Sequence, residues 1–424
     1  MRHSELLQRI EKKKAKIAVI GLGYVGLPLA ILFAKKGYQV TGFLRDKTKA
    51  SALERGEHYL TDLGITDELK NVLKNGTLRI VTMDTSEAGK QDVLIVCVPT
   101  PIDHKKKPDI AAIRSVAKFL QRINLEGKLL INESTVAPGM TRDVFGVLPG
   151  MYYLVCSPER VDPGNKGKPV AAIPKIVGGI DKKSQQLAKA LYESVLDHPV
   201  VSVSTLETAE MVKMLENTYR AVNIALVNEF AKLCEVSGID VVEVIDAAKT
   251  KWSFQPHYPG IGVGGHCIPV DPYYLLEYAG KKHVPLSLVS TGLRENEEMV
   301  GHVLNKLRLV YKKGMRVLVY GLAYKKNVKD IRESPVIAFC HLLADSNIPF
   351  IVYDPYLSES EVKNLGFAVG TLSPADILVV GTDHSQLAAD SKKLIGENTS
   401  VIDGRNFFQR KVGKAVLGVG RSYI

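Results

Sequence analysis

Residues 16–28 read KIAVIGLGYVGLP, and this stretch decides the fold of the first third of the chain. A short β-rich run of five residues is followed at once by Gly21, Gly23 and Gly26. The first glycine allows a tight turn, the second lets a pyrophosphate approach the backbone, and the third permits close helix packing. The pattern therefore predicts a strand, a glycine turn and a helix whose N-terminus holds the phosphates of a dinucleotide.

The residues that follow extend this pattern into an α/β domain. A helical stretch over residues 27–36 ends at Gly37, and each later strand-like run ends in a polar or proline-bearing loop. The predicted strands are residues 38–43, 93–98, 129–131 and 153–156. Strands that alternate with helices indicate a parallel sheet, and ligands bind such sheets beyond the carboxyl ends of the strands. We therefore expect Thr135 and Glu159 near the nicotinamide.

The end of the second predicted strand departs from the dinucleotide pattern. An acidic residue is expected there, about 20 residues after the glycines, to bind the adenosine ribose. Leu44 occupies that place and is followed by Arg45 and Asp46. Asp46 reaches the ribose from a shifted register, or Arg45 faces the 2′-phosphate of NADP, or the cofactor site is weakened. We favour NAD over NADP.

Residues 206–236 contain little glycine or proline and show a helical period, which predicts a long central helix. Lys213 and Asn217 are one turn apart on it and share a face, with Arg220 close by. Such a helix is long enough to connect two domains and to pack against a copy of itself.

A second α/β unit begins at residues 316–323, RVLVYGLA. The loop that follows has four positive residues in eight positions, which suits a pyrophosphate held by lysine and a bidentate arginine. Later strands are predicted at 350–353 and 377–380. The fold class is therefore α/β, with two Rossmann-like doubly wound domains joined by a long central helix and a small helical domain. The expected boundaries are residues 1–202, 203–308 and 309–424, and the two α/β ends would each hold a nucleotide-like ligand.

A thiol lies in the glycine-rich segment GGHCIPVDP, residues 264–272. Gly264 and Gly265 let the backbone pass close to a ligand, and two prolines stiffen the exit. Cys267 in this context favours a covalent catalyst, with Asp271 four residues later; the alternative is a small buried hydrophobe.

Composition narrows the class of protein. The 424 residues carry a formal net charge of +11, which favours anionic partners such as phosphate esters. Nucleic acid is a weaker candidate, because no aromatic-basic surface motif accompanies the charge. Five scattered cysteines argue against a disulfide framework or a metal site and for a reducing compartment. With no apolar run of about 18 residues and no secretory signal at the N-terminus, we expect a cytoplasmic protein without membrane or nucleic-acid partners.

Seven segments, in order, resemble the nucleotide-sugar 6-dehydrogenases, the family of UDP-glucose dehydrogenase, over nearly the whole chain. They are GLGYVGLP, VPTP, ESTVAPG, SPERVDPGN, the helix with Lys213, Asn217, Tyr219 and Arg220, GGHCIPVDP, and GLAYKKNVKDIRESP. SPERVDPGN and His266 resemble the UDP-N-acetylhexosamine branch. Residues 250–260, which precede the segment with Cys267, resemble the UDP-N-acetylglucosamine 6-dehydrogenases rather than the UDP-N-acetylmannosamine enzymes.

The resemblance implies an NAD-dependent four-electron oxidation of the sugar C6 hydroxyl to a carboxylate, through a cysteine thiohemiacetal and thioester. The catalytic residues that it implies are Cys267, Lys213, Asn217, Asp271, Glu159 and Thr135. The cofactor would contact Gly21, Gly23, Tyr24, Val25, Gly26, Arg45, Asp46, Pro99, Thr100 and Thr135. The UDP-sugar would contact Glu159, Arg160, Lys213, Asn217, Arg220, Lys251, Tyr258, Gly264, Lys325 and Arg332. Family enzymes form dimers or larger assemblies, and an aminouronic acid product suits capsule or lipopolysaccharide synthesis.

Other functions remain open at this point. UDP-N-acetylmannosamine, UDP-glucose or TDP-glucose are alternative substrates. A two-electron β-hydroxyacid dehydrogenase shares the cofactor domain and the Lys/Asn helix but does not need Cys267. A non-catalytic nucleotide-sugar-binding protein is favoured only by Leu44, and the intact catalytic set argues against it.

Overall fold

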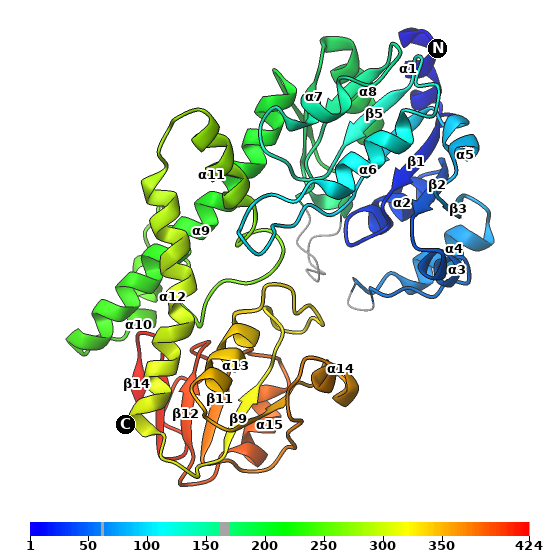
Figure 1. Cartoon of the computed structure of the whole chain (residues 1–424). Helices are drawn as coiled ribbons and strands as arrows, with labels where there is room; N and C mark the ends of the chain where they lie inside the picture. The colour runs from blue at the N-terminus through cyan, green and yellow to red at the C-terminus, as the bar shows by residue number, and fades with distance from the viewer. Residues whose placement is uncertain (61–62, 161–169, 424) are drawn as a thin grey trace. The chain divides into compact units, whose positions relative to one another are not determined.

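The computed structural model describes residues 1–60, 63–160 and 170–423, which divide into two compact units (Figure 1). The first unit consists of Met1–Glu216 and Tyr273–Lys282, and the second of Asn217–Pro272 and His283–Ile424. Helix α9, Leu206–Ser237, begins in the first unit and continues into the second.

The first unit is built on an eight-stranded sheet with the order β3-β2-β1-β4-β5-β6-β7-β8. All neighbouring strands are parallel except β6 and β7, which are antiparallel. The strands are β1 Lys16–Ile20, β2 Gln39–Leu44, β3 Leu78–Thr82, β4 Val93–Val96, β5 Leu129–Asn132, β6 Tyr153–Cys156, β7 Lys175–Gly179 and β8 Val200–Val203.

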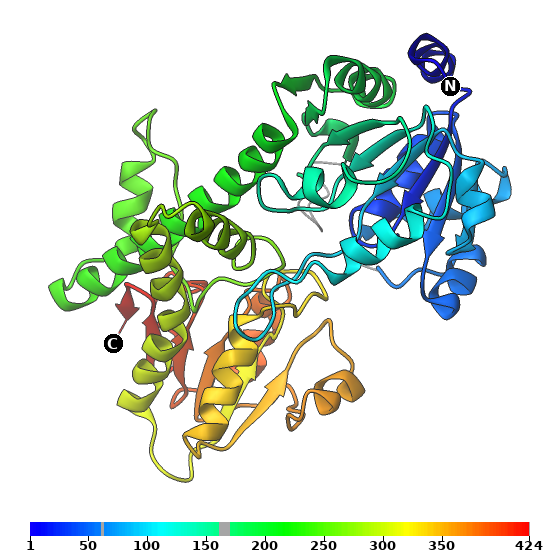
Figure 2. The ribbon, with the colours of Figure 1, turned by 45° about the horizontal axis from the view of Figure 1, so that its top comes forward.

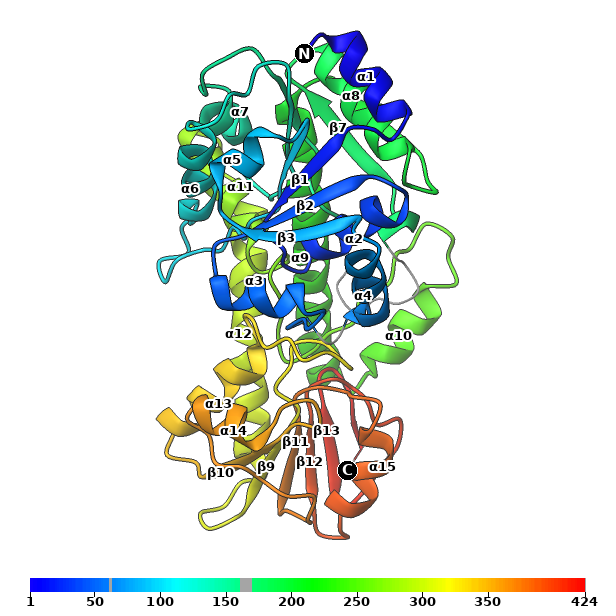
Figure 3. The same ribbon diagram turned by 90° about the vertical axis from the view of Figure 1, so that its right-hand side faces the viewer.

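Both faces of this sheet are buried, as the unbroken apolar sequence of β1 requires. Because side chains alternate along a strand, Ile17 and Val19 join one core with residues of α2 and α8. Ala18 and Ile20 join a second core with residues of α6 and α7. The N-terminal helix α1 lies beside α8 (Figure 3). The helices are α1 His3–Glu11, α2 Gly26–Lys35, α3 Lys47–Glu54, α4 Thr66–Lys74, α5 Thr85–Gly89, α6 Ala111–Leu120, α7 Met140–Phe145, the 3₁₀ turn Val170–Ala172, α8 Lys182–Glu193, and α11 Asp271–Lys281.

The second unit is built on a six-stranded sheet with the order β10-β9-β11-β12-β13-β14. The strands are β9 Val317–Tyr320, β10 Phe350–Tyr353, β11 Ile377–Val380, β12 Ser400–Asp403, β13 Ala415–Gly418 and β14 Ser422–Tyr423. Both faces are again covered, and α12 and α13 lie side by side on one of them (Figure 2). The helices are α10 Val241–Ala248, α12 Ser287–Val310, α13 Pro335–Asp345, α14 Glu359–Asn364 and α15 Leu387–Leu394.

The α/β fold class with two Rossmann-like sheets is confirmed. Two antiparallel pairs were not expected from the sequence. For β13 and β14 the reason is that only three residues connect them, too few for a parallel crossover. The division into three domains stays a prediction. Among the described residues, no helix has the length and apolar character needed to cross a bilayer.

Candidate functional site

The glycine turn after β1 has the geometry that a dinucleotide phosphate needs. Gly21 has φ +95°, and a Cβ there would lie 2.6 Å from the carbonyl oxygen of Cys97. A Cβ on Gly26 would lie 1.9 Å from the Gly21 oxygen, so only glycine allows α2 to start this close to β1. At Gly23 a Cβ would have no neighbour within 4 Å, which leaves its backbone open to a ligand. Tyr24 and Val25, both half-buried, complete the turn. The turn therefore fits the cofactor that the sequence predicts.

The position at which the sequence predicts ribose binding lies at the end of β2. Strand β2 ends at Leu44, which pairs with Thr82 of β3 without a bulge. Arg45 and Asp46 are exposed beyond it. Asp46 is the N-cap of α3, and its Oδ1 accepts a hydrogen bond from the Lys49 backbone N–H at 3.0 Å. One carboxylate oxygen of Asp46 therefore already accepts a hydrogen bond within the protein.

Two further loops at the carboxyl edge of the first sheet are held in place. In the loop after β4, Pro99 is exposed and Thr100 is buried. The Tyr274 hydroxyl of α11 donates to the Pro101 carbonyl, 3.1 Å away, in the same loop. In the loop after β5, Thr135 is half-buried, and the neighbouring Ser134 hydroxyl accepts from the Val98 N–H at 3.0 Å.

Glu210 of α9 braces the loop that carries Thr135. Its carboxylate accepts hydrogen bonds from the backbone N–H groups of Gly139 (2.6 Å) and Thr141 (2.8 Å), at the start of α7. Burial raises the pKa of Glu210 to about 7, although these hydrogen bonds favour the charged form. Sequence reasoning did not identify this residue.

Glu159 belongs to a buried group of ionisable side chains that the sequence reasoning did not identify either. Lys175, at the start of β7, has its Nζ 3.1 Å from Glu159 Oε2 and also pairs with Glu133. Glu133 in turn accepts a hydrogen bond from the Tyr192 hydroxyl of α8. These four side chains, Glu133, Glu159, Lys175 and Tyr192, are called the carboxylate cluster below. The only sequence signal was a lysine opening the apolar run KIVGG.

Arg160 follows Glu159 and contacts α9. Its guanidinium pairs with Glu216, with an Nη2–Oε1 distance of 2.5 Å, and donates to the Pro174 carbonyl at 2.8 Å. The rest of the motif SPERVDPGN, from Val161 to Asn165, lies outside the described residues.

On α9, Lys213 and Asn217 are both buried, whereas Arg220 is exposed. The Asn217 side-chain amide donates to Asp271 Oδ2 at 2.5 Å, so two residues 54 positions apart are paired in the second unit. Lys213, Thr135 and Glu159 belong to the first unit.

The loop with Cys267 packs against the loop after β9. A Cβ on Gly264 would lie 2.6 Å from Cβ of Tyr324, and Gly265 has φ +91° with Tyr324 ring atoms against it. The Gly265 N–H donates to the Arg332 carbonyl at 3.1 Å. The glycines are needed because two backbones approach here.

Cys267 differs from the other cysteines. It is partly exposed, whereas Cys97, Cys156, Cys234 and Cys340 are buried. Its backbone carbonyl accepts the Asp271 N–H at 2.8 Å, so the thiol residue precedes the first turn of α11. Burial raises the pKa of the Cys97 and Cys156 thiols, which makes them poor nucleophiles.

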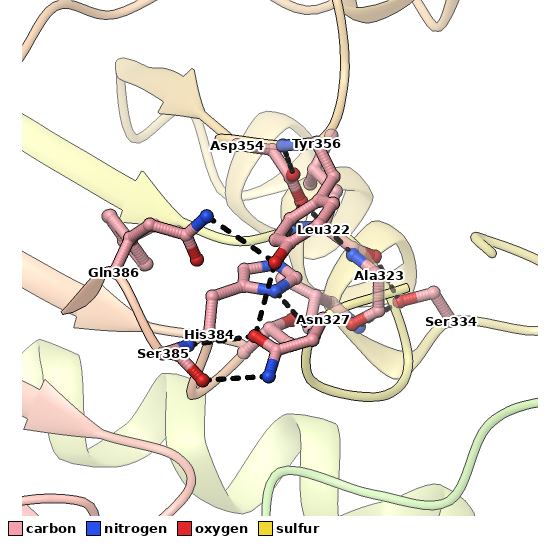
Figure 4. Close-up of polar contacts among 12 residues, drawn as sticks. Leu322, Ala323, Asn327, Ser334, Asp354, Tyr356, His384, Ser385 and Gln386 are labelled. Atoms are coloured by element: carbon pink, nitrogen blue, oxygen red, sulfur yellow. Dashed lines mark hydrogen bonds and ion pairs between the residues drawn. The ribbon is translucent and has the colours of Figure 1, made fainter. Parts of the chain in front are cut away.

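The loop after β9 is held by a buried acid and a histidine (Figure 4). Asp354 Oδ2 accepts the backbone N–H groups of Leu322 (2.6 Å) and Ala323 (3.3 Å). His384 Nδ1 accepts the Asn327 N–H at 2.9 Å, so the ring proton is on Nε2, which faces Asp354 Oδ2 at 3.4 Å. Burial alone would raise the pKa of Asp354, but the His384 and backbone hydrogen bonds lower it.

The predicted substrate contacts in the second unit are placed as follows. The Arg332 guanidinium pairs with Asp330 (Nη2–Oδ2 2.6 Å), and Lys325 is half-buried in the same loop. Lys251 is exposed after α10, and the exposed Tyr258 donates to Asp246 at 3.2 Å. Among the described residues, no group of three or more His, Cys, Asp or Glu side chains has a metal-binding arrangement.

Three family models match the chain in sequence order. They describe the NAD binding domain (residues 15–196), the central domain (207–298) and the UDP binding domain (318–410) of the UDP-glucose/GDP-mannose dehydrogenase family. The chain is 34% identical to the UDP-N-acetyl-D-mannosamine dehydrogenase of Methanococcus vannielii, over 96% of this chain and 97% of that protein. It is 35% identical to the UDP-N-acetyl-D-glucosamine 6-dehydrogenase of Pseudomonas aeruginosa, over 95% of each.

Solved structures agree with this assignment. The structure is similar to that of the UDP-D-ManNAc dehydrogenase of Pyrococcus horikoshii, with a TM-score of 0.85, 34% identity, and coverage of 96% of this chain and 99% of that one. It is also similar to a UDP-glucose dehydrogenase of Pyrobaculum islandicum, with a TM-score of 0.85, 26% identity, and coverage of 96% and 98%.

Proposed function

Because this chain belongs to the UDP-glucose/GDP-mannose dehydrogenase family, an NAD-binding family of oxidoreductases, we propose that it oxidises the C6 hydroxyl of a UDP-N-acetylhexosamine to the carboxylate. One observation carries this proposal: the partly exposed thiol of Cys267 lies in a glycine loop that leads directly to Asp271, the partner of buried Asn217. A thiol beside a polar pair suits covalent capture of an aldehyde.

Two observations support the choice of sugar: the names of the relatives and the resemblance over residues 250–260. Relatives with similar identity are named for the mannosamine and the glucosamine substrates, which supports an N-acetylhexosamine. The resemblance over residues 250–260 favours UDP-N-acetylglucosamine, with UDP-N-acetylmannosamine as the alternative. The oxidised product, an aminouronic acid, suits a capsule or lipopolysaccharide pathway.

The first oxidation needs a group to take the C6 hydroxyl proton and a donor for the developing oxyanion. NAD, when bound, supplies the hydride acceptor for both oxidations. Lys213 and Asn217 are proposed for the proton and oxyanion roles, with a water held by Asp271. Their burial supports this, because electrostatic interactions are stronger away from solvent.

The second stage uses the thiol. The thiolate of Cys267 attacks the aldehyde carbon, and the resulting thiohemiacetal is oxidised to a thioester. Water then forms a C–O bond as the C–S bond breaks, and Cys267 leaves as a thiolate. Thr135 and Glu159 are proposed to orient this water. Covalent capture also prevents loss of the aldehyde between the two oxidations.

A count of reduced cofactor tests the function. The protein is incubated with UDP-N-acetylglucosamine, UDP-N-acetylmannosamine, UDP-glucose or TDP-glucose and with NAD or NADP. Two reduced cofactors per sugar support the proposal, one indicates a two-electron dehydrogenase, and binding without reduction indicates a nucleotide-sugar-binding protein. Cys267→Ser should bind the UDP-sugar and fail to complete four-electron turnover; two NADH per sugar from this variant would refute the thioester route. Cys234→Ala, which removes a buried thiol of the same unit, is the control.

We also propose a homodimer through α9. The described residues of this helix carry a row of exposed apolar side chains at three-, four- and seven-residue steps: Met211, Leu215, Tyr219, Leu226, Phe230 and Leu233. A continuous apolar stripe of this kind is usual where a helix packs against a partner. A second copy of the chain is the proposed occupant.

A further inference from the structure

Two acids and one lysine meet inside the first unit although they are far apart in the sequence. Glu133 follows β5, Glu159 follows β6, and Lys175 begins β7, which runs antiparallel to β6. The lysine therefore starts at the edge where the other two strands end. Its ammonium contacts both carboxylates, and all three residues are buried.

Such a group is costly to bury. Removing a charge from water carries a penalty of several kcal/mol per ion, and well-packed apolar residues are often equal or better for stability. Three buried ionisable groups at the ligand edge of a sheet therefore point to a functional requirement. The nearest group with a proposed chemical role is Glu159.

The contacts fix the Glu159 carboxylate on both sides. Oε1 accepts the Arg160 backbone N–H at 2.6 Å, and Oε2 faces the Lys175 ammonium at 3.1 Å. The Glu159 N–H also donates to the Glu133 carbonyl at 3.2 Å. Lys175 is itself held by Glu133, and Glu133 by Tyr192. The carboxylate has one orientation as long as this chain of contacts is intact.

The charges of the cluster are unequal. Burial raises the pKa of Glu133 to about 8, despite the nearby Lys175 ammonium. Burial alone would also raise the pKa of Glu159, but Lys175, Glu133 and the Arg160 N–H lower it to about 2. The two carboxylates raise the pKa of Lys175, against the effect of burial. The cluster thus shifts the two acids in opposite directions: the pKa of Glu133 is raised and that of Glu159 is lowered.

We propose that Lys175 and Glu133 are positioning residues that hold the Glu159 carboxylate in one orientation, so that it accepts a hydrogen bond from the water that cleaves the Cys267 thioester. This inference rests on the proposed function. Glu159 held in this way orients the water but accepts its proton only weakly. Its pKa is lowered, whereas a general base works best with a pKa near the working pH. The proton of the water therefore passes to solvent as the C–S bond breaks.

The test measures hydrolysis apart from oxidation. Wild-type protein, Lys175→Gln, Glu159→Gln and the double variant are mixed with UDP-sugar and NAD, and the sugar adduct on Cys267 is followed by intact mass. Lys175→Gln should accumulate the thioester and lower kcat about 100-fold with little change in the KM for UDP-sugar, as expected when a reacting group is misplaced. The double variant should be no slower than Glu159→Gln, because the lysine acts through Glu159.

Controls separate this role from a structural one. Lys189→Gln removes an exposed lysine of α8 that pairs with Glu193 and should behave as wild type. Lys175→Arg keeps the cation and should recover part of the hydrolysis rate. If Lys175→Gln does not fold by circular dichroism, Tyr192→Phe and Glu133→Gln test the same chain of contacts, and each should slow adduct hydrolysis.

The outcomes are distinguishable. If wild type reduces no cofactor with any UDP-sugar, the proposed function fails and the inference fails with it. A second outcome is that wild type produces two NADH per sugar, but the folded Lys175→Gln variant hydrolyses the adduct at the normal rate. In that case only the inference is overturned, and the same holds if Tyr192→Phe and Glu133→Gln are used in its place. Multiplicative losses in the double variant would also overturn it.

Discussion

The Asn217 side-chain amide donates a hydrogen bond to Asp271 at 2.5 Å, between the middle of α9 and the first turn of α11. Both side chains are buried, so neither can exchange this partner for bulk water without local opening. The pair connects the helix on which Lys213 also lies to the loop that carries Cys267. Its integrity should therefore affect both stability and the first oxidation.

Asn217→Ala leaves a buried carboxylate without this donor. We expect a loss of about 1–3 kcal/mol of unfolding free energy and a slower first hydride transfer. Chemical denaturation and single-turnover NADH formation measure the two effects. Asn217→Asp combined with Asp271→Asn exchanges the donor and the acceptor and should recover stability but not the rate. Equal recovery of both would show that Asn217 has no role beyond this hydrogen bond.

Glu133→Gln should change how stability depends on pH. The Glu133 pKa is about 8 in the folded protein, above its ordinary 4.5, so the folded state binds a proton that the unfolded chain releases. Stability from this group is present below pH 4.5 and falls as the pH rises to 8. The charges of the neighbouring Lys175, Glu159, Tyr192 and Cys97 do not change in the folded protein within this window, because their pKa values lie outside it.

Urea unfolding of wild type between pH 5 and 8 should therefore show a decline that Glu133→Gln reduces. The effect should be clearest between pH 7 and 8, because Glu210, with a pKa of about 7, contributes a decline of the same sign at lower pH. Glu193→Gln on α8 is the exposed control. An unchanged slope in Glu133→Gln would contradict a protonated Glu133.

Leu44→Asp should restore the missing acid at the end of β2. A carboxylate there accepts hydrogen bonds from the adenosine ribose, so the KM for NAD should fall, by roughly tenfold for one or two such hydrogen bonds. The KM for NADP should rise, because the acid repels a 2′-phosphate. Steady-state kinetics with both cofactors measure this, and Leu44→Asn is the neutral control. No change in either constant would show that the ribose is bound elsewhere.

Phe230→Asp should dissociate the proposed dimer. A charge within the apolar stripe would have to be buried in the interface, at a cost of several kcal/mol. Light scattering after size exclusion should give the dimer mass for wild type and the monomer mass for the variant. Val147→Asp, at an exposed position outside α9, is the control. A monomeric wild type would contradict the proposal.

Short stretches of sequence were enough to predict the strands and helices that are marked by an apolar run or by a helical period. Strands β1, β6, β10 and β11 have the predicted bounds because each is an apolar run bounded by charged or turn residues. The long helix α9 was predicted to within one residue of its end.

The carboxylate cluster could not be predicted in this way. Lys175 pairs with residues 42 and 16 positions earlier, and Tyr192 with one 59 positions earlier. The order of the strands in the sheet brings these residues together although they are far apart in the sequence. No local sequence pattern specifies that order. Asp354 and His384 are a similar case, since they are 30 residues apart and follow different strands.

The close approach of Gly264 and Gly265 to Tyr324 has a consequence for how these proteins can be recombined. A designer who wishes to transplant substrate preference between relatives would naturally exchange the C-terminal sheet alone. That exchange would replace Tyr324 and leave the loop with Cys267, whose Gly264 and Gly265 pack against the Tyr324 side chain, unchanged. An exchange of the C-terminal sheet of this chain should therefore include the segment from Gly260 to Pro272, because the two pieces fit each other.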